Sequence, residues 1–174
     1  MELADWLSQK KQEIVREWIR ATMEAYPAEA LNILKKNNNR FANPLPHIIS
    51  TNIERLFEDL LLGIDSERTS PILAEIVKVR AVQDFPPSKA LHFIFDLKKI
   101  LEKMQNEKAK ADDKPHPGQL SDFIKEIDEL AMLAFDIYVQ CKEKLYEIRA
   151  NEIRNQTHML IRRVNEMDQQ KEAR

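Results

Sequence analysis

Glycine and cysteine are both scarce in this chain. The 174 residues include 2 glycines, Gly63 and Gly118, which lie far apart. Phosphate-binding loops, dinucleotide-binding turns and tight hairpins need glycine where φ is positive or where the backbone approaches a ligand. The sequence therefore excludes those motifs. The lone Cys141 cannot form an internal disulfide, which is typical of a reducing compartment.

Neither charge sign dominates, and no apolar run is long. Lys and Arg number 27 against 29 Asp and Glu, so the net charge is −2 and no overall field attracts nucleic acid or anionic lipid. The longest apolar run, Leu60–Ile64, is too short to span a bilayer. The first five residues lack the features of a signal peptide. We expect a cytoplasmic protein without nucleic-acid partners or membrane insertion.

Apolar residues at helical spacing are abundant, and no alternating strand pattern occurs. They predict helices over 3–25, 30–34, 44–64, 70–82, 87–104 and 119–174, with a charged, proline-bearing linker at 106–118. Proline is favoured at the first helical position, so Asn43-Pro44, Ser70-Pro71 and Pro86-Pro87 predict helix starts. The apolar face of 87–104, which includes Phe95, is the widest and predicts the central helix. We expect an all-α protein with a single bundle of about six helices.

The last helix is too long for the bundle. About 50 helical residues span roughly 75 Å, whereas a globule of about 120 residues is roughly 35 Å across. The sequence therefore predicts a sensory-type bundle at 1–145 and a protruding helical extension at 146–174. We expect homodimerisation through a heptad-like seam there, which a five-residue step from Ile148 to Ile153 makes short or irregular. The predicted seam residues are Leu145, Ile148, Ile153, Leu160, Val164 and Met167.

Residues able to carry catalysis or bind metals form no constellation. The four histidines, His47, His92, His116 and His158, are never three or four apart, and no cysteine pair could complete a zinc site. An all-α bundle invites comparison with globins, but these histidines lie on polar faces or in the linker. Carboxylate pairs such as Glu58-Asp59 are also expected on polar faces. We predict no catalytic residues, no metal, no cofactor and no enzymatic activity.

Two polar segments between predicted helices stand out, residues 40–44 (RFANP) and 80–88 (RAVQDFPPS). Arg80 and Asp84 are four apart and could pair along one helix face. Such segments are consistent with well-built helix junctions. The alternative is that they line a shared site or transmit a conformational change. The candidate signalling residues are Arg40, Phe41, Asn43, Pro44, Arg80, Gln83, Asp84 and Ser88.

These two segments resemble the signature segments of the RsbRD N-terminal domain family, and the stretch from Trp18 to Tyr26-Pro27 ahead of them matches as well. The resemblance covers roughly residues 5–145. It implies an α-helical sensory domain of RsbT co-antagonist proteins, which regulate the general stress sigma factor in bacteria. A long C-terminal helix would pass the signal to an output module, which is a STAS domain in the co-antagonists. Nothing in this sequence resembles a STAS domain, so we expect a stand-alone sensor or adaptor.

The residues leave a second function open. A small-molecule or cofactor-binding module would place a pocket between the central helices of the same bundle. The signal sensed and the protein partner are not specified by the sequence.

Overall fold

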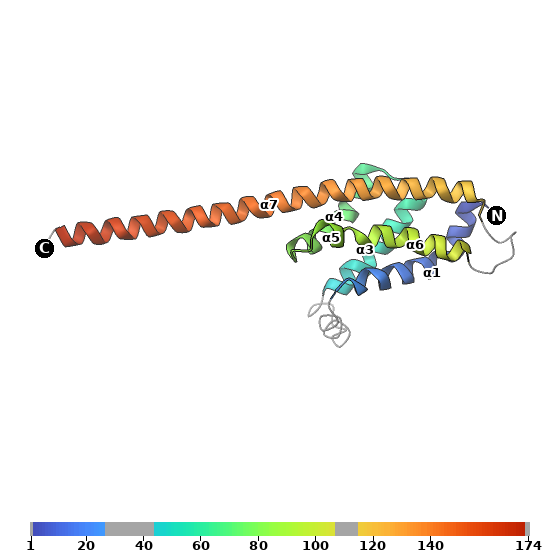
Figure 1. The fold of residues 1–174 in the computed structure, drawn as a ribbon, viewed down its shortest axis with the longest axis horizontal. Helices are drawn as coiled ribbons and strands as arrows, with labels where there is room; N and C mark the ends of the chain where they lie inside the picture. The colour runs from blue at the N-terminus through green and yellow to red at the C-terminus, as the bar shows by residue number, and fades with distance from the viewer. Residues whose placement is uncertain (1, 27–43, 107–114, 173–174) are drawn as a thin grey trace. The chain divides into compact units, whose positions relative to one another are not determined.

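The fold is helical throughout the part of the chain that the computed structural model describes, residues 2–26, 44–106 and 115–172. Figure 1 shows six helices in these ranges, which confirms the predicted all-α class, the number of helices and the long C-terminal helix. The predicted short helix at 30–34 lies outside the described residues. The helices are α1 (Leu3–Glu24), α3 (Pro44–Leu61), α4 (Ser66–Val82), α5 (Pro87–Ala90), α6 (His92–Asn106) and α7 (Pro117–Glu172).

The chain divides into two compact units, Met1–Tyr138 and Val139–Arg174. The first unit holds α1 to α6 together with the N-terminal part of α7, and the second consists of the remainder of α7. None of the described helices combines the length and the apolar character needed to cross a bilayer.

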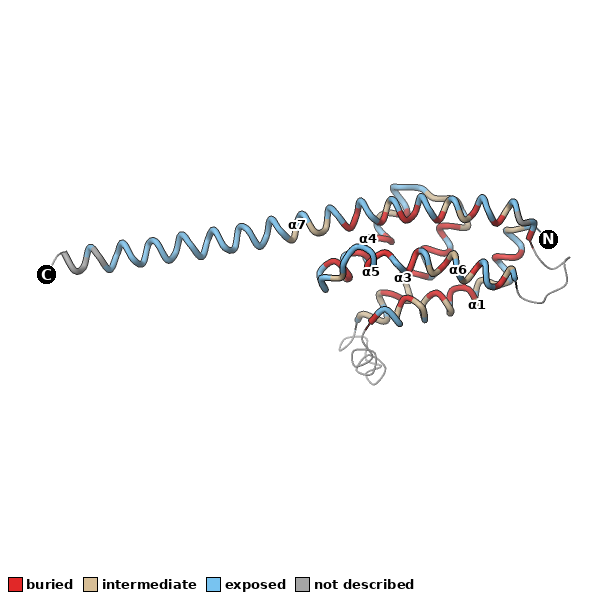
Figure 2. Tube along the Cα trace, in the orientation of Figure 1, coloured by how far each residue is buried: buried red, intermediate tan, exposed pale blue. Residues whose placement is uncertain are grey.

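The first unit is built around α1, which packs against both α3 and α6, while α4 packs against α3. Each of these helices turns an apolar stripe inward, as Figure 2 shows by the buried segments along one side of each. The short α5 contacts both α4 and α6 and so links them. The largest side chains with essentially no exposure include Trp18, Phe57 and Phe93.

Two details of the first unit differ from the sequence prediction. α4 begins at Ser66, so Pro71 lies inside the helix and does not open it. The reason is Asp65, whose carboxylate accepts hydrogen bonds from the backbone N–H groups of Glu67 and Arg68 and caps the helix five residues earlier. The prediction that Phe95 belongs to the central apolar face was also wrong, because its ring is partly exposed beneath the ammonium group of Lys98.

The predicted start at Pro44 is confirmed as the first residue of α3, and Pro87 as the first residue of α5. Pro86 precedes α5 in extended backbone conformation, as expected for a residue followed by proline.

The second unit is a single helix with exposed apolar side chains. Its described residues are exposed from Tyr146 through Met167, as Figure 2 shows along this part of α7. The predicted seam residues lie here, with Leu145 half-buried and Ile148, Ile153, Leu160, Val164 and Met167 exposed.

Candidate functional site

The segment 80–88 forms the corner between α4 and α5. Its backbone makes two bonds that close the end of α4: the N–H of Asp84 donates to the carbonyl of Ala81, and the N–H of Phe85 donates to that of Arg80. Asp84 has a φ of 57°, in the left-handed region where such helix ends usually carry glycine. Because α4 ends at Val82, Arg80 and Asp84 do not share a helix face, and the predicted pairing along such a face was wrong.

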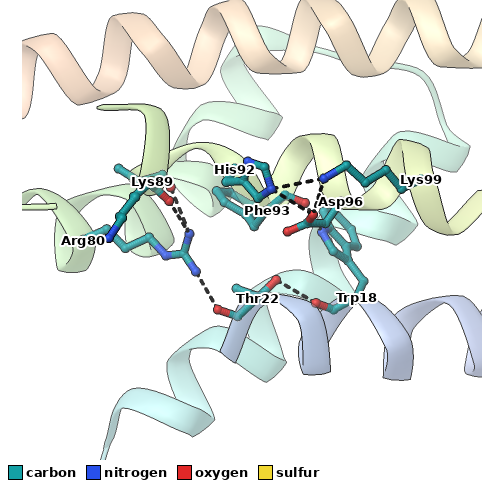
Figure 3. Close-up of polar contacts among 9 residues, drawn as sticks. Trp18, Thr22, Arg80, Lys89, His92, Phe93, Asp96 and Lys99 are labelled. Atoms are coloured by element: carbon teal, nitrogen blue, oxygen red, sulfur yellow. Dashed lines mark hydrogen bonds and ion pairs between the residues drawn. The ribbon is translucent and has the colours of Figure 1, made fainter. Parts of the chain in front are cut away.

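The guanidinium of Arg80 is the centre of this corner and is 0% exposed. One nitrogen donates to the carbonyl of Thr22 in α1 at 2.8 Å. Another donates to the carbonyl of Ala90 at 3.1 Å and, more weakly, to that of Lys89 at 3.3 Å, both in α5. Figure 3 shows the side chain of Arg80 spanning between these two sides.

Three aromatic rings surround the same guanidinium. The ring centres of Phe93, Tyr26 and Phe85 lie 5.1, 5.6 and 6.0 Å from its central carbon. Rings at this range attract a cation through their negative faces. Burial lowers the pKa of Arg80, and the nearby Tyr26 and Asp96 act against that shift.

Arg80 makes no ion pair with a carboxylate of the described residues. Its contacts are instead carbonyl groups in the last turns of helices. The last carbonyls of a helix have no partner within it and carry partial negative charge. Thr22 lies in the last turn of α1, and Lys89 and Ala90 end α5. The cation therefore satisfies the ends of two helices while sitting in the last turn of a third, α4.

The neighbouring polar groups extend this network along α1. The indole N–H of Trp18 donates to the carbonyl of Phe93 at 2.6 Å, and its ring stacks on the Phe93 ring. The hydroxyl of Thr22 donates back to the carbonyl of Trp18 at 2.7 Å (Figure 3). Both side chains are fully buried, so α1 and α6 are held together by polar contacts inside the core.

Tyr26 and Arg80 each keep one buried polar atom without a hydrogen bond to the described residues, the hydroxyl of Tyr26 and Nε of Arg80. Burial raises the pKa of Tyr26, and the positive charge of Arg80 opposes this. Buried polar atoms without partners are uncommon in folded proteins. They mark this corner as a place where the packing is not optimised for stability alone.

Phe85 joins the corner to α7. Its ring contacts that of Tyr26, with 5.3 Å between the ring centres. Its carbonyl accepts a hydrogen bond of 2.7 Å from the hydroxyl of Tyr138, the last residue of the first unit. The corner thus contacts α1, α5, α6 and α7 within one unit. We call the set Thr22, Tyr26, Arg80, Phe85 and Tyr138 the arginine junction.

The other candidate residues named from the sequence do not meet at this junction. Gln83, Asp84 and Ser88 are exposed on the same corner, and Pro44 is exposed at the start of α3. Arg40, Phe41 and Asn43 lie outside the described residues. Thr22, Tyr26 and Tyr138 were not singled out as site residues. Their spacing from Arg80 in the chain gives no local signal of the contact.

A second polar cluster links α3 to α4. Asp59 is only 4% exposed, so the expectation that Glu58-Asp59 lies on a polar face was wrong for Asp59. Its carboxylate accepts hydrogen bonds from Nε of Arg68 and from the hydroxyl of Thr69. Because both partners come from the next helix, this cluster fixes the turn between α3 and α4.

The titratable side chains offer no metal centre in the described ranges, where no group of three His, Cys, Asp or Glu could hold an ion. The four histidines are exposed. His92 contacts the carboxylate of Asp96 at 3.3 Å, and His116 accepts a hydrogen bond from the N–H of Gly118.

Comparison with known proteins gives one match. A family model described as the RsbT co-antagonist protein rsbRD N-terminal domain matches residues 12–153. That range contains the arginine junction and the first part of the second unit. No curated protein and no solved structure matches the chain.

Proposed function

Because the chain belongs to the family of RsbT co-antagonist RsbRD N-terminal domains, we propose that it is a non-enzymatic sensory domain acting in the bacterial stress response through contacts with other proteins. The family consists of regulatory signalling domains. The observation that carries the proposal is the family match over residues 12–153, which includes both the junction and the start of the exposed helix. The output is provided by a protein partner bound to the C-terminal part of α7.

The arginine junction supplies a route for the signal within the first unit. Its contacts reach α1, α5, α6 and α7, so a change at any of these helices alters the surroundings of the same guanidinium. The hydrogen bond from Tyr138 to the carbonyl of Phe85 is the last polar link before the second unit begins. A signal that displaces Phe85 would therefore weaken a bond that fixes α7 at Tyr138.

Hydrogen exchange on a Tyr138→Phe variant tests this coupling. Loss of the hydroxyl is expected to speed amide exchange in residues 139–150, because the helix loses its polar attachment to the corner. Tyr146→Phe makes the same chemical change at an exposed ring and is expected to leave exchange unaltered. Equal exchange in the two variants would contradict the proposed coupling.

Affinity capture tests the partner contact. The full chain serves as bait beside Leu160→Glu, which places a charge on the exposed apolar stripe, and Glu152→Lys, which changes an exposed charged residue. We expect a protein retained by the unchanged chain and by Glu152→Lys, but lost with Leu160→Glu. A partner retained equally by all three baits would show that α7 is not the contact.

A groove between α1 and α3 favours the second candidate, a small-molecule binding module. Its volume is about 370 Å³, within the range of small-molecule sites. The apolar side chains of Val15 and Ile19 line it together with charged residues such as Lys11 and Glu58, which pair at 2.6 Å. A ligand here would need both an apolar body and a charged group.

Thermal-shift screening and mass spectrometry of the purified chain test this alternative, and an absorption spectrum tests for a bound chromophore. Ile19→Trp, which fills the groove, is expected to abolish any ligand-induced shift. A shift that persists in Ile19→Trp would place the ligand elsewhere.

A further inference from the structure

The exposed apolar residues of the second unit follow one unbroken heptad register. Starting from Tyr146, apolar or small residues recur in alternating steps of four and three as far as Met167. We call these residues the seam: Tyr146, Ala150, Ile153, Thr157, Leu160, Val164 and Met167. The larger of them (Tyr146, Ile153, Leu160, Val164 and Met167) are 50 to 64% exposed.

This register differs from the seam expected from the sequence. A seam through Leu145 and Ile148 requires a step of five to reach Ile153. Passing through Tyr146 and Ala150 instead removes that irregularity, because both residues lie at heptad spacing from Ile153. Leu145 and Ile148 then lie beside the seam, and the coiled-coil pattern runs for about three heptads without a break.

The polar group within the seam is already satisfied. The hydroxyl of Thr157 donates to the carbonyl of Ile153 in its own helix at 2.9 Å. Thr157 can therefore enter an apolar interface without leaving an unpaired donor. Charged side chains beside it also bond along the same helix, as Arg162 does with Glu166 at 2.8 Å.

The residue types select the kind of partner. The three first-core positions of the heptads hold small or β-branched residues, Ala150, Thr157 and Val164. The other core positions hold Tyr146, Ile153, Leu160 and Met167. β-Branched residues at the first position with leucine at the second favour two parallel strands. We propose that a second copy of this chain occupies the seam, parallel and in register, to form a two-stranded coiled coil.

The flanking charges distinguish the parallel pairing from an antiparallel one. In the parallel arrangement, Lys142 of one chain faces Glu147 of the other, which is attractive. Arg149 faces Arg154 of the other chain, which is repulsive. Changing Arg154 to glutamate would make the second pair attractive as well. Arg154→Glu is therefore expected to strengthen the parallel dimer.

This inference rests on the proposed function in that it names the first partner of α7, and sedimentation of the full chain tests it separately. We expect a concentration-dependent dimer that Ile153→Glu converts to monomer and that Ile148→Glu leaves intact. The two variants introduce the same charge, on and beside the seam. A monomeric unchanged chain, or a dimer broken by Ile148→Glu and not by Ile153→Glu, would overturn the pairing.

Cross-linking tests the orientation. In a Cys141→Ser background, Tyr146→Cys brings two thiols together only when the helices are parallel and in register. In an antiparallel seam the two positions are at least about 16 Å apart along the axis. Oxidation is expected to give a covalent dimer of Tyr146→Cys. A chain that sediments as a dimer but does not cross-link would refute the parallel arrangement. If a monomeric chain still captures a separate partner through α7, the pairing fails while the proposed function stands.

Discussion

Replacing Arg80 with methionine would remove the cation from the arginine junction and leave its apolar stem. Methionine is unbranched and fills a similar path between the rings of Tyr26, Phe85 and Phe93. The change therefore tests the charge and its hydrogen bonds more than the packing. The carbonyls of Thr22 and Ala90 would lose their donor while remaining inside the protein.

Two opposing effects decide the magnitude. A hydrogen bond to a charged group contributes about 1.5–3 kcal/mol, and an unsatisfied buried carbonyl costs about 1–3 kcal/mol. Against this, methionine avoids the desolvation of a buried cation, which amounts to several kcal/mol. The two short bonds, at 2.8 and 3.1 Å, and the three surrounding rings offset most of that desolvation in the native protein. We expect Arg80→Met to lower the free energy of unfolding by about 2–4 kcal/mol.

Urea unfolding followed by circular dichroism measures this loss. Arg20→Met is the matched control, because Arg20 is an exposed residue of α1 that pairs with Glu17 and Glu24 on the surface. Such pairs contribute at most about 1 kcal/mol. If Arg80→Met is no less stable than Arg20→Met, the cation does not hold the helix ends together, and our account of the junction is wrong.

A lysine at the same position adds a pH test. Burial, which lowers the pKa of Arg80, would also lower the pKa of a lysine there. The unfolded chain would then bind the proton more readily than the folded one, so the stability of Arg80→Lys should rise with pH up to the ordinary pKa of lysine. The unchanged chain keeps arginine protonated throughout that range. A parallel pH dependence in both proteins would refute this reasoning.

Three further changes test the corners of the fold by chemical denaturation. Asp84→Val should be less stable than Asp84→Gly by about 1–2 kcal/mol, because both lose the carboxylate and only valine places a branched side chain at φ 57°; equal stabilities would contradict this. Asp59→Asn should cost about 1–3 kcal/mol through the weakened contact with Arg68, and an unchanged midpoint would show that the charge is not needed. Thr22→Val should cost about 0.5–1.5 kcal/mol by removing the donor to the carbonyl of Trp18, and a gain in stability would refute that role.

The helices themselves were predictable because their apolar spacing is a local property. The start at Pro44 followed from the same kind of local rule. The start of α4 did not, because two capping signals compete within a few residues. Asp65 captures two backbone N–H groups, and Pro71 is tolerated in the second turn. A rule that gives priority to proline then misplaces the helix start.

The junction was only half predictable. The resemblance drew attention to Arg80, but its burial could not be inferred, since a lone arginine without a carboxylate partner is usually solvated. The contacts that make burial tolerable come from Thr22, 58 residues away, and from α5. They depend on where three helix ends meet, which is a property of the packing. Asp59 escaped prediction for the same reason, because Thr69 lies on the following helix.

The position of Trp18 gives the protein its own optical reporter. The indole is fully buried, bonded to the carbonyl of Phe93 and stacked on that residue's ring, next to the guanidinium of Arg80. The other tryptophan, Trp6, is replaceable by phenylalanine, which would leave a single emitter beside the junction. Its fluorescence would then shift to longer wavelength whenever water reaches this part of the core. A ligand, a protein partner or a stress condition that opens the junction could thus be recognised in a cuvette, without a label and before the signal is known.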